Sequence, residues 1–128
     1  GKGAWRNGER ISVSSVTACE NALVATGFPY EIASRVDEIL ERMRPVLSSC
    51  QGVRRCGAAA LDLAWTACGR FDAFYEDELK PWDMAAGALL VTEAGGSISN
   101  LDGSPFDLRW SILAGNKAMH ELIGKMIR

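Results

Sequence analysis

The sequence predicts an α/β protein in which helices cover both faces of a largely parallel sheet. Short apolar segments alternate with helix-like segments from residue 22 onward, which is the pattern of parallel strands joined by helical crossovers. The 128 residues suffice for one domain with a real core. A hydrophobic fraction of 48% and a charged fraction of 23% exclude a disordered or collagen-like chain.

Charge and hydropathy limit the partners and the compartment. Lys and Arg number 14 against 16 Asp and Glu, for a net charge of −2, so no cationic surplus predicts nucleic-acid binding. No segment approaches the ~18 apolar residues of a membrane span, and residues 1–6 hold no apolar signal core. We therefore expect a cytoplasmic protein that binds neither a membrane nor nucleic acid.

The cysteines predict a reduced protein. Cys19, Cys50, Cys56 and Cys68 form no Cys-x-x-Cys pair and there is a single histidine, His120, so we do not expect a structural zinc site. Cys56 and Cys68 lie among apolar residues and are expected to be small buried hydrophobes. A chain of this size does not need disulfides for stability.

The first half of the chain predicts a hairpin, a strand and a helix. Asn7-Gly8 is a strong two-residue turn signal within a hairpin over residues 1–14, which needs partner strands because a lone hairpin is marginal in water. An apolar strand follows at residues 22–26. A helix begins near Ile32 and is expected to stop near Pro45. Its polar face carries opposite charges at helical spacing, namely Glu31, Arg35, Glu38 and Arg42.

The second half predicts alternating strands and helices. The expected helices are residues 58–68, closed by Gly69, residues 82–94, with Asp83 as N-cap and Gly95-Gly96 as terminator, and residues 117–127, capped by Asn116. The expected strands are residues 53–56, 73–75, 97–99 and 111–114, with a turn at Asp102-Gly103.

Asp83 is the first candidate for chemistry. As an N-cap it would only satisfy backbone N–H groups. Alternatively its carboxylate binds Mg²⁺, which usually takes one or two carboxylates plus substrate phosphate. One residue can serve both purposes, so both interpretations stay open.

Glu76 and the segment Gly57-Ala58-Ala59-Ala60 are the second and third candidates. The run Glu76-Asp77-Glu78 is either a solvated loop or places Glu76 in a cleft at a strand end, where ligands collect in α/β sheets. The small residues after Gly57 either permit close helix packing or expose N–H groups to a ligand. We expect His120 to lie on the surface and Asp62 to make a local polar contact.

Together these segments resemble the C-terminal half of the inositol monophosphatase family, whose members are magnesium-dependent, lithium-sensitive phosphatases. The resemblance is carried by residues 57–64, 69–76, 79–87 and 93–96, with Trp-Asp-Met-Ala-Ala-Gly at 82–87 as the most specific block. It implies a layered α/β/α/β/α sandwich. The hairpin at 1–14 then belongs to a first sheet that is missing here, and residues 15–128 form the substrate-side domain.

The resemblance also implies roles for individual residues. Asp83 matches the aspartate that binds catalytic Mg²⁺ and contacts substrate, and Glu76 matches the glutamate that hydrogen-bonds a substrate hydroxyl. Gly57, Ala58 and Ala59 match the segment whose backbone contacts the substrate. Ala58 departs from the family, which commonly has Ser or Thr there.

A larger departure is the absence of the family's first metal motif, Asp-Pro-(Ile/Leu)-Asp-Gly-Thr. Together with the lack of an initiating Met, this predicts a fragment of a larger enzyme. We expect the isolated chain to bind Mg²⁺ weakly and release no phosphate, with the remaining metal ligands in the missing N-terminal half.

The resemblance thus implies half of a phosphomonoesterase that hydrolyses a small sugar or inositol phosphate by metal-activated water, and it implies a homodimer. Histidinol phosphate, fructose bisphosphate, adenosine bisphosphate and NADP remain alternative substrates. A non-catalytic regulatory or interaction module is the alternative of another class.

Overall fold

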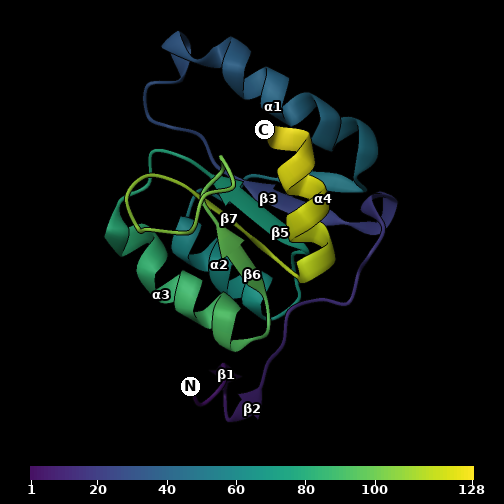
Figure 1. Cartoon of the computed structure of the whole chain (residues 1–128), viewed down its shortest axis with the longest axis vertical. Helices are drawn as coiled ribbons and strands as arrows, with labels where there is room; N and C mark the ends of the chain where they lie inside the picture. Colours follow the sequence, from purple (N-terminus) through teal and green to yellow (C-terminus); the bar gives the residue numbers. More distant parts are fainter.

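A mixed five-stranded sheet is the centre of the computed structural model, which describes residues 1–128 (Figure 1). The strand order across the sheet is β4-β3-β5-β7-β6. The strands are β3 (Leu23–Thr26), β4 (Gly52–Arg54), β5 (Ala73–Glu76), β6 (Ser97–Ser99) and β7 (Ile112–Gly115).

Four of the five strands point the same way. β3 pairs in parallel with β4 and β5, while β7 lies antiparallel between β5 and β6. The expected largely parallel sheet is therefore confirmed, with β7 as the exception. β7 follows β6 through a loop rather than a helix, and a connection without a crossover helix joins antiparallel neighbours.

Two pairs of helices cover the two faces of the sheet, as expected (Figure 1). α2 (Ala59–Ala67) and α3 (Pro81–Glu93) pack together on one face. α1 (Val36–Ser49) and α4 (Lys117–Ile127) cover the other. No helix is both long enough and apolar enough to cross a membrane.

The predicted end of α1 near Pro45 is wrong. Pro45 lies inside the helix, which continues to Ser49. Proline removes only one N–H donor, and the following turn is held by Val46, which is fully buried in the core and accepts a hydrogen bond from the Cys50 N–H. Before α1, Ile32–Ser34 form a 3₁₀ turn rather than the expected α-helix.

The core consists of one apolar cluster on each side of the sheet. Leu63, Phe74 and Met84 lie in the cluster beneath α2 and α3, and Met119 and Ile123 lie in the cluster beneath α1 and α4. These five side chains are fully buried, so the sheet is held from both faces.

The N-terminal hairpin is confirmed but shorter than expected. β1 (Trp5–Arg6) and β2 (Glu9–Arg10) form a separate antiparallel pair. Asn7 and Gly8 have φ of 52° and 84°, the left-handed geometry of a type I′ turn. The hairpin lies beside the end of α3 (Figure 1), where Glu93 accepts the Gly3 N–H at 2.7 Å.

All four cysteines are free thiols. The prediction that Cys56 is buried is wrong, because its side chain is exposed on the loop before α2. Cys68 is half-buried and donates to the Trp65 carbonyl.

Candidate active site

The candidate site lies at the carboxyl ends of the parallel strands. Gly27 follows β3, Arg55 follows β4, and Glu76 ends β5. Because these three strands run in parallel, the residues after them reach the same edge of the sheet. This edge is where ligands bind in open α/β sheets.

Glu76 is half-buried with its carboxylate pressed against the backbone of Gly27. A Cβ added at Gly27 would overlap that carboxylate. Burial, reinforced by the nearby Asp62, raises the pKa of Glu76 to about 7. Near neutral pH Glu76 can therefore both accept and donate a hydrogen bond, and the alternative of a fully solvated loop is wrong for this residue.

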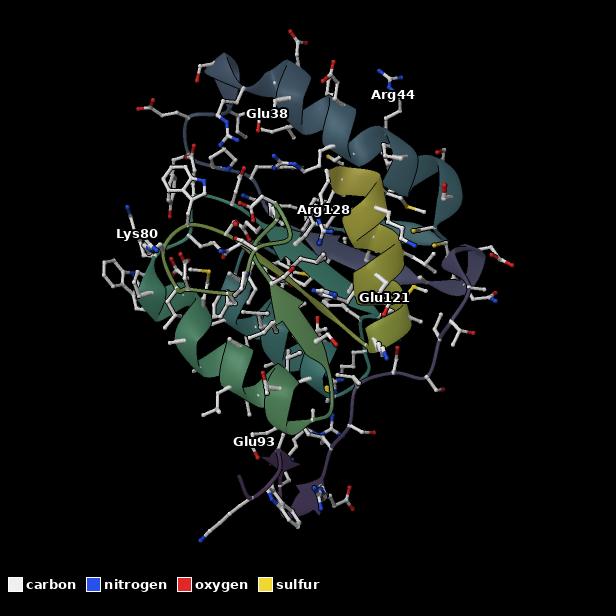
Figure 2. All side chains as sticks on the ribbon, in the orientation of Figure 1. Glu38, Arg44, Lys80, Glu93, Glu121 and Arg128 are labelled. Atoms are coloured by element: carbon white, nitrogen blue, oxygen red, sulfur yellow. The ribbon has the colours of Figure 1, made fainter.

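Asp83 lies in the first turn of α3, but it is not the N-cap. Lys80 occupies that position and donates its backbone N–H to Asp83 Oδ2 at 2.9 Å. The N-cap prediction failed because the helix begins two residues earlier, at Pro81, a residue favoured in the first turn. Figure 2 shows Lys80 at this end of α3. The hydrogen bond uses one carboxylate oxygen and leaves Oδ1 available.

The segment 57–59 turns the chain from β4 into α2. Gly57 has φ of 82°, and a Cβ there would meet only the Arg55 side chain. Gly57 is therefore required by the left-handed backbone and not by close helix packing. Ala58 is the N-cap, and its carbonyl accepts the N–H groups of Leu61 and Asp62. The N–H groups of Ala59 and the next residue have no helical acceptor, as at any helix start.

Asp62 was missed as a site residue and its expected local polar contact is absent. It is fully buried, and neither carboxylate oxygen accepts a hydrogen bond. Burial raises its pKa, although the Cys56 thiol and the Arg55 guanidinium nearby partly offset this. The sequence feature that could have revealed Asp62 is its charge, because it lies between Leu61 and Leu63 on an otherwise apolar helix.

Arg55 was missed as well. Its guanidinium lies within electrostatic range of both Asp62 and Glu76, and it acts to lower the pKa of each. It also lies over the ring of Phe28, 6.0 Å from the centroid. Arg55 is therefore the cation of the candidate site.

Asp77 and Glu78 do not form a solvated run either. Asp77 accepts hydrogen bonds from Arg35 at 2.8 Å and from Arg42 at 2.9 Å, and Glu78 pairs with Arg35 at 2.6 Å. Although burial acts to raise it, these hydrogen bonds hold the pKa of Asp77 below its ordinary value. The predicted pairs of Glu38 with Arg35 and Arg42 are also present.

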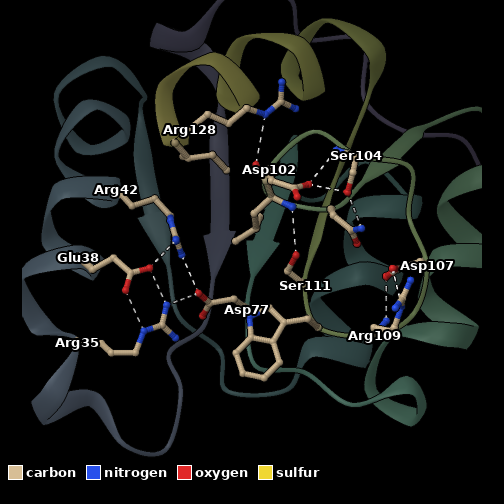
Figure 3. Close-up of a pocket in the computed structure, with 14 residues that line it drawn as sticks. Arg35, Glu38, Arg42, Asp77, Asp102, Ser104, Asp107, Arg109, Ser111 and Arg128 are labelled. Carbon is tan, nitrogen blue, oxygen red and sulfur yellow. Dashed lines mark hydrogen bonds and ion pairs between the residues drawn. The ribbon is translucent and has the colours of Figure 1, made fainter.

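A cavity of about 750 Å³ lies next to this ion-pair cluster and not at the candidate site. Figure 3 shows its walls, with α1 on one side, the loop from Asp102 to Ser111 on the other, and Arg128 above. None of Gly57, Ala58, Ala59, Glu76 and Asp83 lines it. Glu76 and Gly27 line a crevice of about 10 Å³, the size of one water molecule.

The acidic and thiol groups form no complete metal site. No three His, Cys, Asp or Glu side chains come together in a way that could hold a metal ion. His120 is half-buried rather than on the surface. Its Nε2 lies 2.9 Å from Ser99 Oγ, and burial lowers its pKa. It lies outside the candidate site.

A family model described as the inositol monophosphatase family matches residues 1–128. The chain belongs to the inositol monophosphatase family. It is 49% identical over 119 residues to "Nus factor SuhB" of Pseudomonas aeruginosa, covering 91% of this chain and 44% of that protein. It is 43% identical over 131 residues to "Inositol-1-monophosphatase" of Caulobacter vibrioides, covering 100% of this chain and 51% of that protein.

Solved structures of the inositol monophosphatase family agree with the fold. The extragenic suppressor protein suhB from Bartonella henselae superposes with a TM-score of 0.93 at 39% identity, covering 98% of this chain and 48% of that chain. Inositol monophosphatase from Anabaena superposes with a TM-score of 0.92 at 38% identity, covering 98% of this chain and 50% of that chain. The chain therefore spans about half the length of the relatives that it matches.

Proposed function

We propose that this chain is the substrate-side half of a Mg²⁺-dependent phosphomonoesterase that releases phosphate from a small sugar or inositol phosphate. The observation that carries the proposal is that Glu76 ends β5 within electrostatic range of Asp83, while Gly57, Ala58 and Ala59 lead from the end of β4 into α2. Membership of the family supports the reaction class.

Asp83 fits a role as one Mg²⁺ ligand. Its Oδ2 is held by the Lys80 N–H, which fixes the carboxylate while Oδ1 stays available. Mg²⁺ usually takes one or two carboxylates together with water and phosphate. The cation, when bound, would activate a water for attack on phosphorus. Because no group of three ligands forms here, we place the other ligands in an N-terminal half.

The other residues would hold the alcohol part of the substrate. Glu76 would accept a hydrogen bond from a substrate hydroxyl, while the backbone of Gly57, Ala58 and Ala59 would contact it directly. The positive end of the α3 helix dipole, at Asp83, would face the phosphate and its cation. Asp83 is therefore the one catalytic residue that we assign in this chain.

An N-terminal half is the first partner that we propose. The outer face of α2 and α3 carries large exposed apolar side chains, which a lone domain would leave in water: Leu61 is 51% exposed, Trp82 78% and Leu89 62%. A second sheet packed on this face would bury them. In that arrangement the hairpin at 1–14 joins the first sheet, and residues 15–128 form the substrate-side domain.

Several finer features belong to the same proposal. The enzyme would be a lithium-sensitive, cytoplasmic homodimer, and the chain alone would bind Mg²⁺ weakly and release no phosphate. Histidinol phosphate, fructose bisphosphate, adenosine bisphosphate and NADP are alternative substrates, because the hydroxyl-binding residues named above suit any polyol ester.

A non-catalytic interaction role is the second candidate. Some relatives are called "Nus factor SuhB", which is not an enzyme name. This naming favours the interaction role. The near-neutral charge argues against a direct nucleic-acid partner.

The deciding experiment measures phosphate release from a panel of phosphate esters by the full-length protein, with and without Mg²⁺. Mg²⁺-dependent turnover of inositol 1-phosphate supports the enzyme and its substrate, and preference for another ester replaces only the substrate. No turnover, combined with a stable protein partner in pull-down and no Mg²⁺ binding, supports the interaction role.

A further inference from the structure

Asp77 and Glu78 turn the chain away from the end of β5 and lie between two residues of the candidate site. Glu76 precedes them as the last residue of β5, and Asp83 follows in the first turn of α3. Glu78 has φ of 56°. A residue with a side chain keeps this left-handed backbone only where its surroundings hold it there. The turn therefore needs support from another part of the molecule.

Two arginines of α1 supply that support. Arg35, the N-cap of α1, donates hydrogen bonds to Asp77 at 2.8 Å and to Glu78 at 2.6 Å. Arg42, further along the helix, donates to Asp77 at 2.9 Å. Figure 3 shows both arginines extending from α1 toward Asp77. Because Asp77 is buried and both arginine side chains are mostly covered, solvent screens these ion pairs little.

This support reaches Glu76 more directly than Asp83. Glu76 is bonded directly to Asp77 along the chain. On the other side of the turn, Leu79 has anchors of its own, since its side chain is buried beneath α2 and α3 and its N–H donates to the Trp110 carbonyl at 3.0 Å. Asp83 lies beyond this second anchor. A change at the arginines should therefore move Glu76 and leave Asp83 in place.

We propose that Arg35 and Arg42 are positioning residues for Glu76, which they hold in place through Asp77. This role rests on the proposed function, in which Glu76 binds a substrate hydroxyl. The two arginines act from α1, on the face of the sheet opposite to α2 and α3. Without Arg35, the adjacent charges of Asp77 and Glu78 repel each other and the left-handed turn can relax. Glu76 then moves away from the carboxyl edge of the sheet.

The kinetic test compares Arg35→Met with Arg44→Met in the full-length protein. Methionine keeps an unbranched apolar side chain and removes the guanidinium. Arg44 is the matched control, because it is exposed on the outer side of the same helix (Figure 2). With inositol 1-phosphate and Mg²⁺, KM should rise about fivefold in Arg35→Met, while kcat changes less than about twofold. Arg44→Met should leave both values unchanged, and an equal rise of KM in the two variants overturns the proposal.

Removal of Glu76 distinguishes positioning from a general loss of structure. In Glu76→Ala, adding Arg35→Met should raise KM no further, because the residue that Arg35 positions is gone. The same rise of KM with and without Glu76 overturns the proposal, and so does an unchanged KM in Arg35→Met alone.

Arg35→Lys is the conservative variant, and it replaces Arg35→Met in every comparison if that variant does not fold. An ammonium group keeps the charge but cannot bridge Asp77 and Glu78 as the planar guanidinium does. Its KM should therefore lie between those of the parent enzyme and Arg35→Met. A KM equal to that of the parent overturns the bridging role of Arg35.

A titration of the Glu76 carboxyl by ¹³C NMR, without Mg²⁺, tests the positioning role independently of phosphate release. Loss of the Arg35 cation alone would raise the pKa of Glu76, whereas movement of its carboxylate from the Gly27 backbone into solvent would lower it. In Arg35→Met we expect this pKa to fall from about 7 toward its ordinary value of 4.5. An unchanged or higher pKa overturns the positioning role. A parent enzyme that releases no phosphate overturns the proposed function instead, and the titration still decides whether the arginines position Glu76.

Discussion

The carboxylate of Glu76 lies directly against the backbone of Gly27, so closely that a Cβ at Gly27 would overlap it. This contact joins the ends of two neighbouring parallel strands, β3 and β5. It leaves no room for a side chain at residue 27, and it determines where the carboxylate lies at the edge of the sheet.

Gly27→Ala is therefore expected to move the Glu76 carboxylate without unfolding the chain, because the far end of a flexible side chain can shift. If Glu76 holds a substrate hydroxyl, KM of the full-length enzyme should rise about tenfold, the value of one lost hydrogen bond. Gly52→Ala is the matched control in β4, where the added Cβ meets ordinary contacts. An unchanged KM in Gly27→Ala would contradict the assigned role of Glu76.

Because of Glu76, the free energy of unfolding should decrease as the pH rises. Its pKa rises from 4.5 to about 7 in the folded chain, so folding takes up a proton between these values. The stabilising effect of that proton is complete below pH 4.5 and is lost as the pH rises to 7.

Glu76→Gln removes this titration. Urea unfolding should show the variant more stable than the parent chain by about 1 kcal/mol at pH 8, after allowance for solvent screening, and equal to it near pH 4.5. The same difference at both pH values would show that Glu76 does not titrate as described.

Asp77 should change the pH dependence of stability in the opposite direction to Glu76. Its two arginine partners lower its pKa in the folded chain, so its contribution is present above pH 4 and is lost as the pH falls through the lowered pKa. Asp77→Asn leaves Arg35 and Arg42 without their shared buried partner and should cost about 2–3 kcal/mol at pH 7. Asp107→Asn, at an exposed pair with Arg109, should have a much smaller effect because solvent screens that pair. Equal losses would contradict the importance of the buried cluster.

Gly87 marks the closest approach of α3 to α2. A Cβ there would overlap the side chain of Leu63, so Gly87→Ala should destabilise the chain by about 2 kcal/mol through overpacking. Thermal unfolding measures this, with Ala86→Ser on the exposed side of α3 expected to stay within about 0.5 kcal/mol. The double variant Gly87→Ala with Leu63→Ala should lose less stability than the sum of the losses in the two single variants.

Local signals were sufficient for most of the fold. Asn7-Gly8 placed the hairpin turn, Asn116 caps α4 as expected and accepts the Met119 N–H, and Gly69 has the left-handed φ of a helix end. Each of these depends on neighbouring residues alone. The sequence could not reveal the insertion of β7 between β5 and β6, because that pairing depends on contacts distant in sequence.

Predictions about individual side chains failed where contacts with residues distant in the sequence determine their burial and partners. The buried Val46 carries α1 past Pro45, which the local rule treats as a stop. Asp62 fell inside an apolar helix, and its burial without a partner depends on how α2 packs on the sheet. Asp77 looked like part of a solvated run because its partners, Arg35 and Arg42, are about 40 residues away in sequence.

Asp83→Asn in the full-length protein tests the central claim most directly. Asparagine keeps an oxygen that can accept the Lys80 N–H, so α3 should keep its start while the metal-binding charge is lost. Phosphate release from inositol 1-phosphate should depend on Mg²⁺ in the parent enzyme and fall at least about 100-fold in the variant, with weaker Mg²⁺ binding by calorimetry. No phosphate release by the parent enzyme, together with unchanged Mg²⁺ affinity in Asp83→Asn, would contradict the account.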